Sequence, residues 1–69
     1  MAELMLTING DNRSVPGPAT LADVLAHLEL DARTVVVEHN RTIVRRPNLG
    51  ATPVAEGDQV EIVHFVGGG

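Results

Sequence analysis

The amino-acid sequence predicts an α+β fold, in which a mixed sheet of four to five strands carries one main helix on one face. The chain has 69 residues, which is enough for a single small domain with one modest core. Leu4, Leu6 and Ile8 alternate with other residues at the period of a strand, whereas residues 21–28 show the period of a helix. The apolar stripe of that helix and the apolar face of the strands must cover each other.

The first two strands are predicted to form a hairpin. A strand with one apolar face runs from Glu3 to Ile8 and reaches Asn9-Gly10, a dipeptide typical of a two-residue hairpin turn. A second strand is expected over residues 12–15. Pro16-Gly17-Pro18 is expected to end it, because proline has no N–H group to donate to a neighbouring strand.

A short helix is predicted to follow. Thr20 is a typical N-cap residue, and Asp23 stands three residues later, as in a capping box. Leu21, Val24, Leu25 and Leu28 form a single stripe, while Asp23 and His27 face water. We expect two to three turns, ending near Glu29 or Leu30.

The second half of the chain is predicted to contain three more strands. Residues 34–39 are rich in β-branched side chains, with Val35 and Val37 pointing inward and Val36 and Glu38 outward. Asn40-Arg41 forms a tight turn into a strand at residues 42–44. An irregular connection over residues 47–53 and a turn at residues 56–58 lead to the last strand, residues 60–66.

The order ββαββ(loop)β places the first and last strands side by side and parallel, which is the β-grasp, or ubiquitin-like, architecture. We expect residues 1–66 to form this single domain and residues 67–69 to form a flexible glycine tail. The predicted core consists of Leu4, Leu6, Ile8, Leu21, Val24, Leu25, Leu28, Val35, Val37, Ile43, Val60 and Ile62.

Composition excludes several classes of function. Five arginines stand against nine acids, lysine is absent, and the formal charge is −4, so we expect no nucleic-acid partner. Arg45-Arg46 is interpreted as a solvated loop edge. The absence of cysteine excludes a disulfide scaffold, a thiolate nucleophile and Cys-ligated metals. Apolar runs are too short for a membrane span, no secretion signal is evident, and we expect a cytoplasmic protein.

Side chains offer no convincing catalytic constellation. His27, His39 and His64 lie on different predicted elements without the spacing of a metal site, and Ser14 has no base near it in sequence. We interpret His39 and His64 as half-buried structural imidazoles. The sequence therefore predicts a protein that is not an enzyme and binds no metal or cofactor itself.

The remaining reactive group is the main-chain carboxylate of Gly69. A carboxylate transfers its carbonyl only after activation, for instance as an acyl-adenylate made with ATP, and an enzyme that brings two anions together needs metal and cationic help. Gly67 and Gly68 permit entry into a narrow channel because they lack Cβ. Three extended glycines span about 10 Å.

Four stretches of the chain resemble a known family. They are LTING at residues 6–10, VVVEHNRTIV at 35–44, GDQV at 57–60 and EIVHFVGGG at 61–69. Together they resemble the thiamine-biosynthesis sulfur carriers of the ThiS family over essentially the whole chain, the glycine ending being the most specific part. The proline-rich tract at residues 16–19 departs from the family, whose corresponding loop is often charged.

The resemblance implies a sulfur carrier and its partners. An adenylating, E1-like enzyme would activate Gly69 with ATP and Mg, and a relay fed by a cysteine desulfurase would convert it to a thiocarboxylate. A thiazole synthase would accept the sulfur for the thiazole moiety of thiamine. Three alternatives remain open: a carrier of the type of the molybdopterin-synthase small subunit, a ubiquitin-like docking module with an inert tail, and a protein modifier.

An apolar docking patch is also predicted on the sheet face opposite the helix. Because Glu61 must face solvent, Val63 and Phe65 share its outward direction. The last strand should lie between the first and the third, so Met5 and Val36 are expected as their neighbours. An exposed cluster of these four side chains is typical of an interface core.

Overall fold

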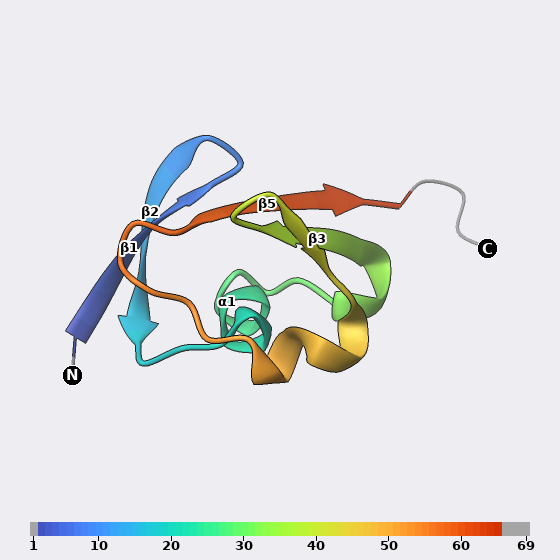
Figure 1. The fold of residues 1–69 in the computed structure, drawn as a ribbon, viewed down its shortest axis with the longest axis horizontal. Helices are drawn as coiled ribbons and strands as arrows, with labels where there is room; N and C mark the ends of the chain where they lie inside the picture. Colours follow the sequence, from blue (N-terminus) through green and yellow to red (C-terminus); the bar gives the residue numbers. More distant parts are fainter. Residues whose placement is uncertain (1, 66–69) are drawn as a thin grey trace.

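Five strands form one mixed sheet, and the helix α1 lies against one of its faces (Figure 1). The computed structural model describes residues 2–65, so Val66, the predicted boundary at residue 66 and the glycines at 67–69 lie outside the described residues. The order across the sheet is β2-β1-β5-β3-β4, which confirms the predicted architecture. The elements are β1 (Ala2–Ile8), β2 (Asp11–Gly17), α1 (Leu21–His27), η1 (Ala32–Thr34), β3 (Val35–His39), β4 (Thr42–Val44), η2 (Arg46–Ala51) and β5 (Gln59–His64).

The parallel pairing of β1 with β5 is confirmed, but it is short. Only Thr7 with Gln59 and Ile8 with Val60 are in register. Beyond this point the side chain of Asn9 replaces a strand residue: its Oδ1 accepts from the Ile62 N–H at 2.7 Å, and its Nδ2 donates to the Ile62 carbonyl at 3.1 Å. The side chain therefore continues the pairing of β5 after β1 has turned away.

The strand β2 is longer than predicted. It continues through Pro16, which lies opposite Glu3, and ends at Gly17. Proline is tolerated here because β2 is an edge strand, and the N–H that proline lacks is not needed by a further neighbour. The predicted turn is confirmed, with φ values of 51° at Asn9 and 85° at Gly10.

The helix begins as predicted and ends earlier. Thr20 and Asp23 form a complete capping box, since the Thr20 Oγ1 accepts from the Asp23 N–H and the Asp23 carboxylate accepts from the Thr20 N–H. The last helical residue is His27. Glu29 then adopts φ 60°, its N–H bonds the Ala26 carbonyl, and the Leu30 N–H bonds the Leu25 carbonyl. This is a Schellman ending with glutamate in the position that glycine usually takes.

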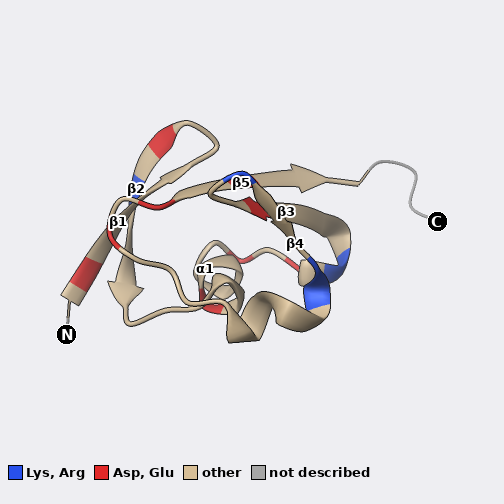
Figure 2. Cartoon of the chain, in the orientation of Figure 1, with Lys and Arg blue, Asp and Glu red and all other residues tan. Residues whose placement is uncertain are grey.

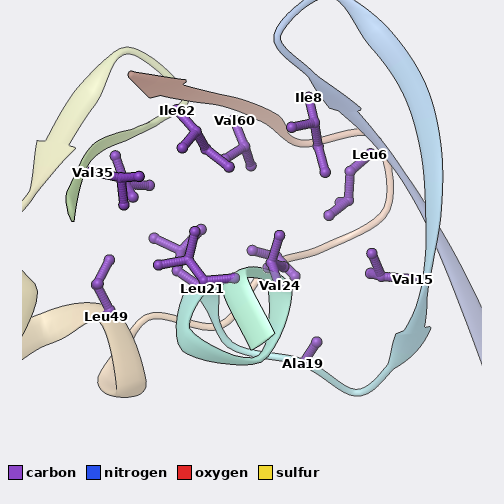
Figure 3. Packing of buried hydrophobic residues seen from close by; sticks show 13 residues of the cluster. Leu6, Ile8, Val15, Ala19, Leu21, Val24, Val35, Leu49, Val60 and Ile62 are labelled. Atoms are coloured by element: carbon purple, nitrogen blue, oxygen red, sulfur yellow. The ribbon is translucent and has the colours of Figure 1, made fainter. Parts of the chain in front are cut away.

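The core lies between the sheet and α1 (Figure 3). Nine of the predicted core residues are buried, and Leu4 and Leu28 pack against them half-buried. Ile43 was predicted as core and this is wrong, because its side chain is 61% exposed. It pairs with the outward-facing Glu38, whereas Val44 pairs with the buried Val37 and packs against the core instead. The buried residues that the pattern did not identify are Val15, Ala19, Leu49 and Val54.

Two of these missed core residues come from the irregular connection before β5. The Leu21 N–H donates to the Thr52 carbonyl at 2.9 Å, and the Val54 N–H donates to the Ala19 carbonyl at 2.9 Å. These bonds hold the connection along the start of α1, and Leu49 and Val54 are therefore buried in the core.

Candidate functional site

The described chain ends just after β5, shortly before the predicted functional glycines in the sequence. Phe65 follows the strand directly, and its N–H donates to the Thr34 carbonyl at 2.9 Å. In Figure 1 this end of the sheet lies on the side away from the β1–β2 hairpin. Gly67, Gly68 and Gly69 themselves are outside the described residues, so their predicted role stays a prediction.

Three apolar side chains occupy the sheet face opposite α1 near this end. Val36 lies beside Val63 in the β3–β5 register, and both alternate with residues that point into the core. The predicted exposure is confirmed for Val63 at 61% and for Phe65 at 55%, while Val36 is half-buried. We call Val36, Val63 and Phe65 the sheet patch.

Met5 does not belong to the sheet patch, and the prediction that it neighbours Val63 and Phe65 is wrong. The β1–β5 register begins at Thr7, so Met5 lies beyond the start of β5 and far from its end. Its carbonyl accepts from the Gly57 N–H at 2.8 Å, and its N–H donates to the Glu56 carboxylate at 2.9 Å. Because β1 and β5 overlap over so few residues, Met5 lies far from Val63 and Phe65 although all three share one sheet face.

A groove that sequence reasoning missed adjoins the sheet patch. It has a volume of about 680 Å³ and lies between the β3–β4 pair and Phe65. Ile43 and the two arginines that follow β4, Arg45 and Arg46, contribute to its wall. The signal that could have identified it is the turn at Asn40-Arg41, because a two-residue turn pairs Ile43 with Glu38 and so directs Ile43 outward.

The three histidines lie in different surroundings and do not form a cluster in the described part of the chain. His27 is exposed, as predicted, and His39 is half-buried, as predicted. The prediction of a half-buried His64 is wrong, because its side chain is exposed. At this position β5 has β3 on one side only, since β1 pairs with β5 no further than Val60. Ser14 donates to the Glu3 carboxylate across the first hairpin.

His39 and Asp58 form a partly buried pair at the other end of β5. The His39 Nε2 and the Asp58 Oδ2 are 2.7 Å apart, and the two side chains are 17% and 16% exposed. The Ala55 N–H donates to the same carboxylate at 2.8 Å, and the Asn40 side chain donates to it at 3.3 Å. These bonds hold the β3–β4 turn against the start of β5, and nothing in them suggests catalysis.

The environment of Asp58 leads to a pH prediction. Burial acts to raise the pKa of Asp58, but hydrogen bonds from His39, the Ala55 N–H and Asn40 together hold that pKa below its ordinary value of 3.8. A carboxylate with a lowered pKa stabilises the fold above its unfolded pKa, and this stabilisation is lost as the pH falls through the folded pKa. We expect Asp58→Asn to lower the free energy of unfolding near neutral pH, and by less and less as the pH falls below 3.8.

Denaturant unfolding of both proteins from pH 7 to pH 2.5 measures this difference. Asp11→Asn, which removes one acid from the exposed first hairpin, is the control for the change of net charge. A difference between Asp58→Asn and the parent that is the same at every pH would contradict the prediction.

Within residues 2–65 no group of three or more His, Asp or Glu side chains could hold a metal ion. None of the helices in the described part of the chain has the length and apolar character needed to cross a membrane. The site therefore consists of an exposed apolar patch, a neighbouring groove and the end of a strand, which is an arrangement suited to contact with another protein.

Comparisons with known proteins agree on one family. The model of the ThiS family matches residues 6–69. The sulfur carrier protein ThiS of Bacillus subtilis is 38% identical over 66 residues, covering 94% of this chain and 100% of that protein. A thiazole synthase of Paramagnetospirillum magneticum is 39% identical over 66 residues, which are 96% of this chain and 20% of the synthase. The chain thus spans about a fifth of the length of that relative.

A solved structure supports the same assignment. The crystal structure of a thiamine biosynthesis protein (ThiS) from Geobacter metallireducens superposes with a TM-score of 0.82 at 36% identity. The superposition covers 96% of this chain and all of the other.

Proposed function

The chain belongs to the ThiS family, and on this premise we propose that it acts as a sulfur carrier in thiamine biosynthesis. The observation that carries the proposal is the match of 94% of this chain with the whole of a protein named sulfur carrier protein ThiS. The family match continues through residue 69 and so includes the glycines.

The proposed chemistry takes place on the carboxylate of Gly69. An activating enzyme joins this carboxylate to the α-phosphate of ATP with help from Mg, and pyrophosphate leaves. A persulfide supplied through a cysteine desulfurase then attacks the acyl carbon and displaces AMP, because phosphate is a far better leaving group than oxide. A thiol then reduces the resulting acyl disulfide, which releases the thiocarboxylate and forms a disulfide on the donor side. The chain itself contains no cysteine, so the terminal carbonyl is where the sulfur is held.

In this proposal the chain is a substrate and carrier rather than an enzyme, and it acts in the cytoplasm because its activation consumes ATP. Thiazole synthase is the proposed acceptor of the sulfur. A stretch of the P. magneticum protein of that name matches nearly all of this chain, which supports a direct relation between the two. Among the described residues, the sheet patch is the proposed docking surface for these partners.

Intact mass spectrometry tests the proposal. The chain is incubated with ATP, Mg, the cognate activating enzyme and a sulfur source, and we expect the mass increase of one oxygen exchanged for sulfur. Subsequent addition of thiazole synthase should remove that increase. No mass change, with partner binding that survives removal of residues 67–69, would favour an inert docking module. Gain of a second protein would favour a modifier, and discharge only to a molybdopterin synthase would favour that pathway.

The sheet patch gives a separate prediction. Phe65→Ala should weaken binding of the activating enzyme by more than about 1 kcal/mol, because an exposed aromatic side chain beside apolar neighbours is typical of an interface anchor. Its loss should change stability little, since the ring is 55% exposed. Titration calorimetry measures the affinity, and thermal unfolding measures the stability.

Met5→Ala is the matched control for this test. Met5 is also exposed, at 44%, but it lies beside Glu56 and Gly57 at the other end of β5. Equal affinities for Phe65→Ala and the parent would remove the sheet patch from the proposal.

A further inference from the structure

Exposed side chains of two kinds line the groove beside the sheet patch. Its walls combine apolar and cationic side chains, and Ile43 at 61% and Phe65 at 55% are among the most exposed large apolar residues of the described chain. Removing exposed apolar side chains from water is favourable, and an exposed apolar cluster in a concave surface is typical of an interaction site. The wall residues important here are Val36, Ile43, Arg45, Arg46, Pro47 and Phe65.

Charge distinguishes the groove from the rest of this acidic chain. Two of the five arginines line it, although the formal charge of the whole chain is −4. Figure 2 shows basic residues at this end of the fold, with an acidic segment close to them and further basic residues on β2 and near the β3–β4 turn. On the outer sheet face the nearest acids by register are Glu38, which pairs with the groove residue Ile43, and Glu61, which pairs with Glu38.

The acid Asp31 lies near enough to Arg46 for the two charges to interact, but it forms its ion pair with Arg33. Its carboxylate is held by Arg33, whose Nε and Nη2 donate to it at 3.1 Å and 2.9 Å. The side chain and the N–H of Arg33 are the main causes that lower the pKa of Asp31 to about 2. Among the described residues the ion pairs within 4 Å are Arg33–Asp31 and His39–Asp58, so neither Arg45 nor Arg46 takes part in one.

The groove also adjoins a free strand edge. The strand β4 is the last in the sheet, and an edge strand presents backbone N–H and C=O groups that a further strand can pair with. A second copy of this chain is a poor occupant. Antiparallel two-fold pairing of β4 centred on Ile43 would bring Arg45 of one copy opposite Arg41 of the other, and like charges opposite each other are destabilising.

We propose that the groove binds an extended segment of a partner protein that carries a carboxylate between apolar side chains and pairs with the edge of β4. The carboxylate contacts Arg45 and Arg46, and the apolar side chains cover Ile43 and Phe65. This inference rests on the proposed function, since it supplies the surface that presents the glycines to the enzymes acting on them. It adds the chemistry of the partner segment.

Charge reversal tests the inference. Arg45→Glu and Arg46→Glu are compared with Arg13→Glu, which changes the net charge equally but lies on β2, the opposite edge of the sheet. The probes are the activating enzyme and thiazole synthase, titrated separately with each variant at low and at high salt. We expect a loss of affinity of about tenfold or more for both groove variants with at least one enzyme, and at most about twofold for Arg13→Glu. The salt dependence of binding should also be weaker for the groove variants.

Three results would overturn the inference. One is equal affinity of the parent and the groove variants for both enzymes. A second is concentration-dependent dimerisation of the parent that Ile43→Asp abolishes, which would assign the groove to a second copy. A third is binding of anionic phospholipid vesicles that Arg45→Glu removes while enzyme binding is unchanged. Failure of the proposed function would be recognised separately. In that case the parent chain itself would gain no sulfur in the mass measurement.

Discussion

Gly68→Val is expected to abolish formation of the thiocarboxylate while leaving the melting temperature close to that of the parent. The proposed reaction requires the end of the chain to enter the nucleotide site of an activating enzyme. A valine places a branched side chain in that path and restricts the backbone at the same position. Removal of Gly69 should have a comparable effect, since it keeps a glycine carboxylate but shortens the reach by roughly 3.3–3.6 Å. A misplacement of about 1 Å can already reduce a rate a hundredfold.

The measurement is the yield of thiocarboxylate by intact mass, with thermal unfolding recorded for each variant. Gly50→Val is the matched control, because a Cβ at Gly50 would meet nothing within 4 Å and that glycine lies in η2, not in the glycine ending. His27→Ala and Ser14→Ala should also keep the parent yield. A normal yield from a chain extended by a C-terminal tag, with no protease present, would falsify the assignment of the chemistry to Gly69.

Leu25→Ala should destabilise the fold by roughly 2–5 kcal/mol. Leu25 is 2% exposed and belongs to the buried stripe of α1, so the substitution leaves a cavity between the helix and the sheet. A small domain has a total stability of about 5 kcal/mol or somewhat more, and this single change therefore approaches complete unfolding. Chemical denaturation followed by circular dichroism measures the loss.

Ile43→Ala is the matched comparison for Leu25→Ala. Both positions carry a branched aliphatic side chain and both are core residues by sequence pattern, but Ile43 is 61% exposed. We expect Ile43→Ala to change stability by no more than about 0.5 kcal/mol. A loss at Ile43 as large as the loss at Leu25 would show that the register of β4 differs from the one described.

Much of the candidate site could be predicted because its parts depend on neighbouring residues in the sequence. The alternation along residues 60–65 was sufficient to place Val63 and Phe65 outside and Ile62 inside. The position of Met5 could not be predicted in the same way. It depends on how far β1 overlaps β5, two strands about fifty residues apart. The alternation of side chains along a strand does not reveal the length of that overlap.

The sequence by itself determined the features that arise from contacts within a few residues. The turns at Asn9-Gly10 and Asn40-Arg41, the capping box of Thr20 and Asp23 and the stripe of α1 were all predicted, because each satisfies local hydrogen bonds or a local period. The early end of α1 was not, since Glu29 takes a backbone conformation that glycine usually signals.

The tertiary structure alone decided which surfaces face each other. Leu49 and Val54 are buried although their segment has no period, because backbone hydrogen bonds hold it along the start of α1. Ile43 is exposed although its sequence neighbours suggest a core strand, because the β3–β4 register pairs it with Glu38. The groove with Arg45 and Arg46 follows from that same register. Pairing between strands and packing between layers set these positions, and such long-range contacts leave no repeating signal along the chain.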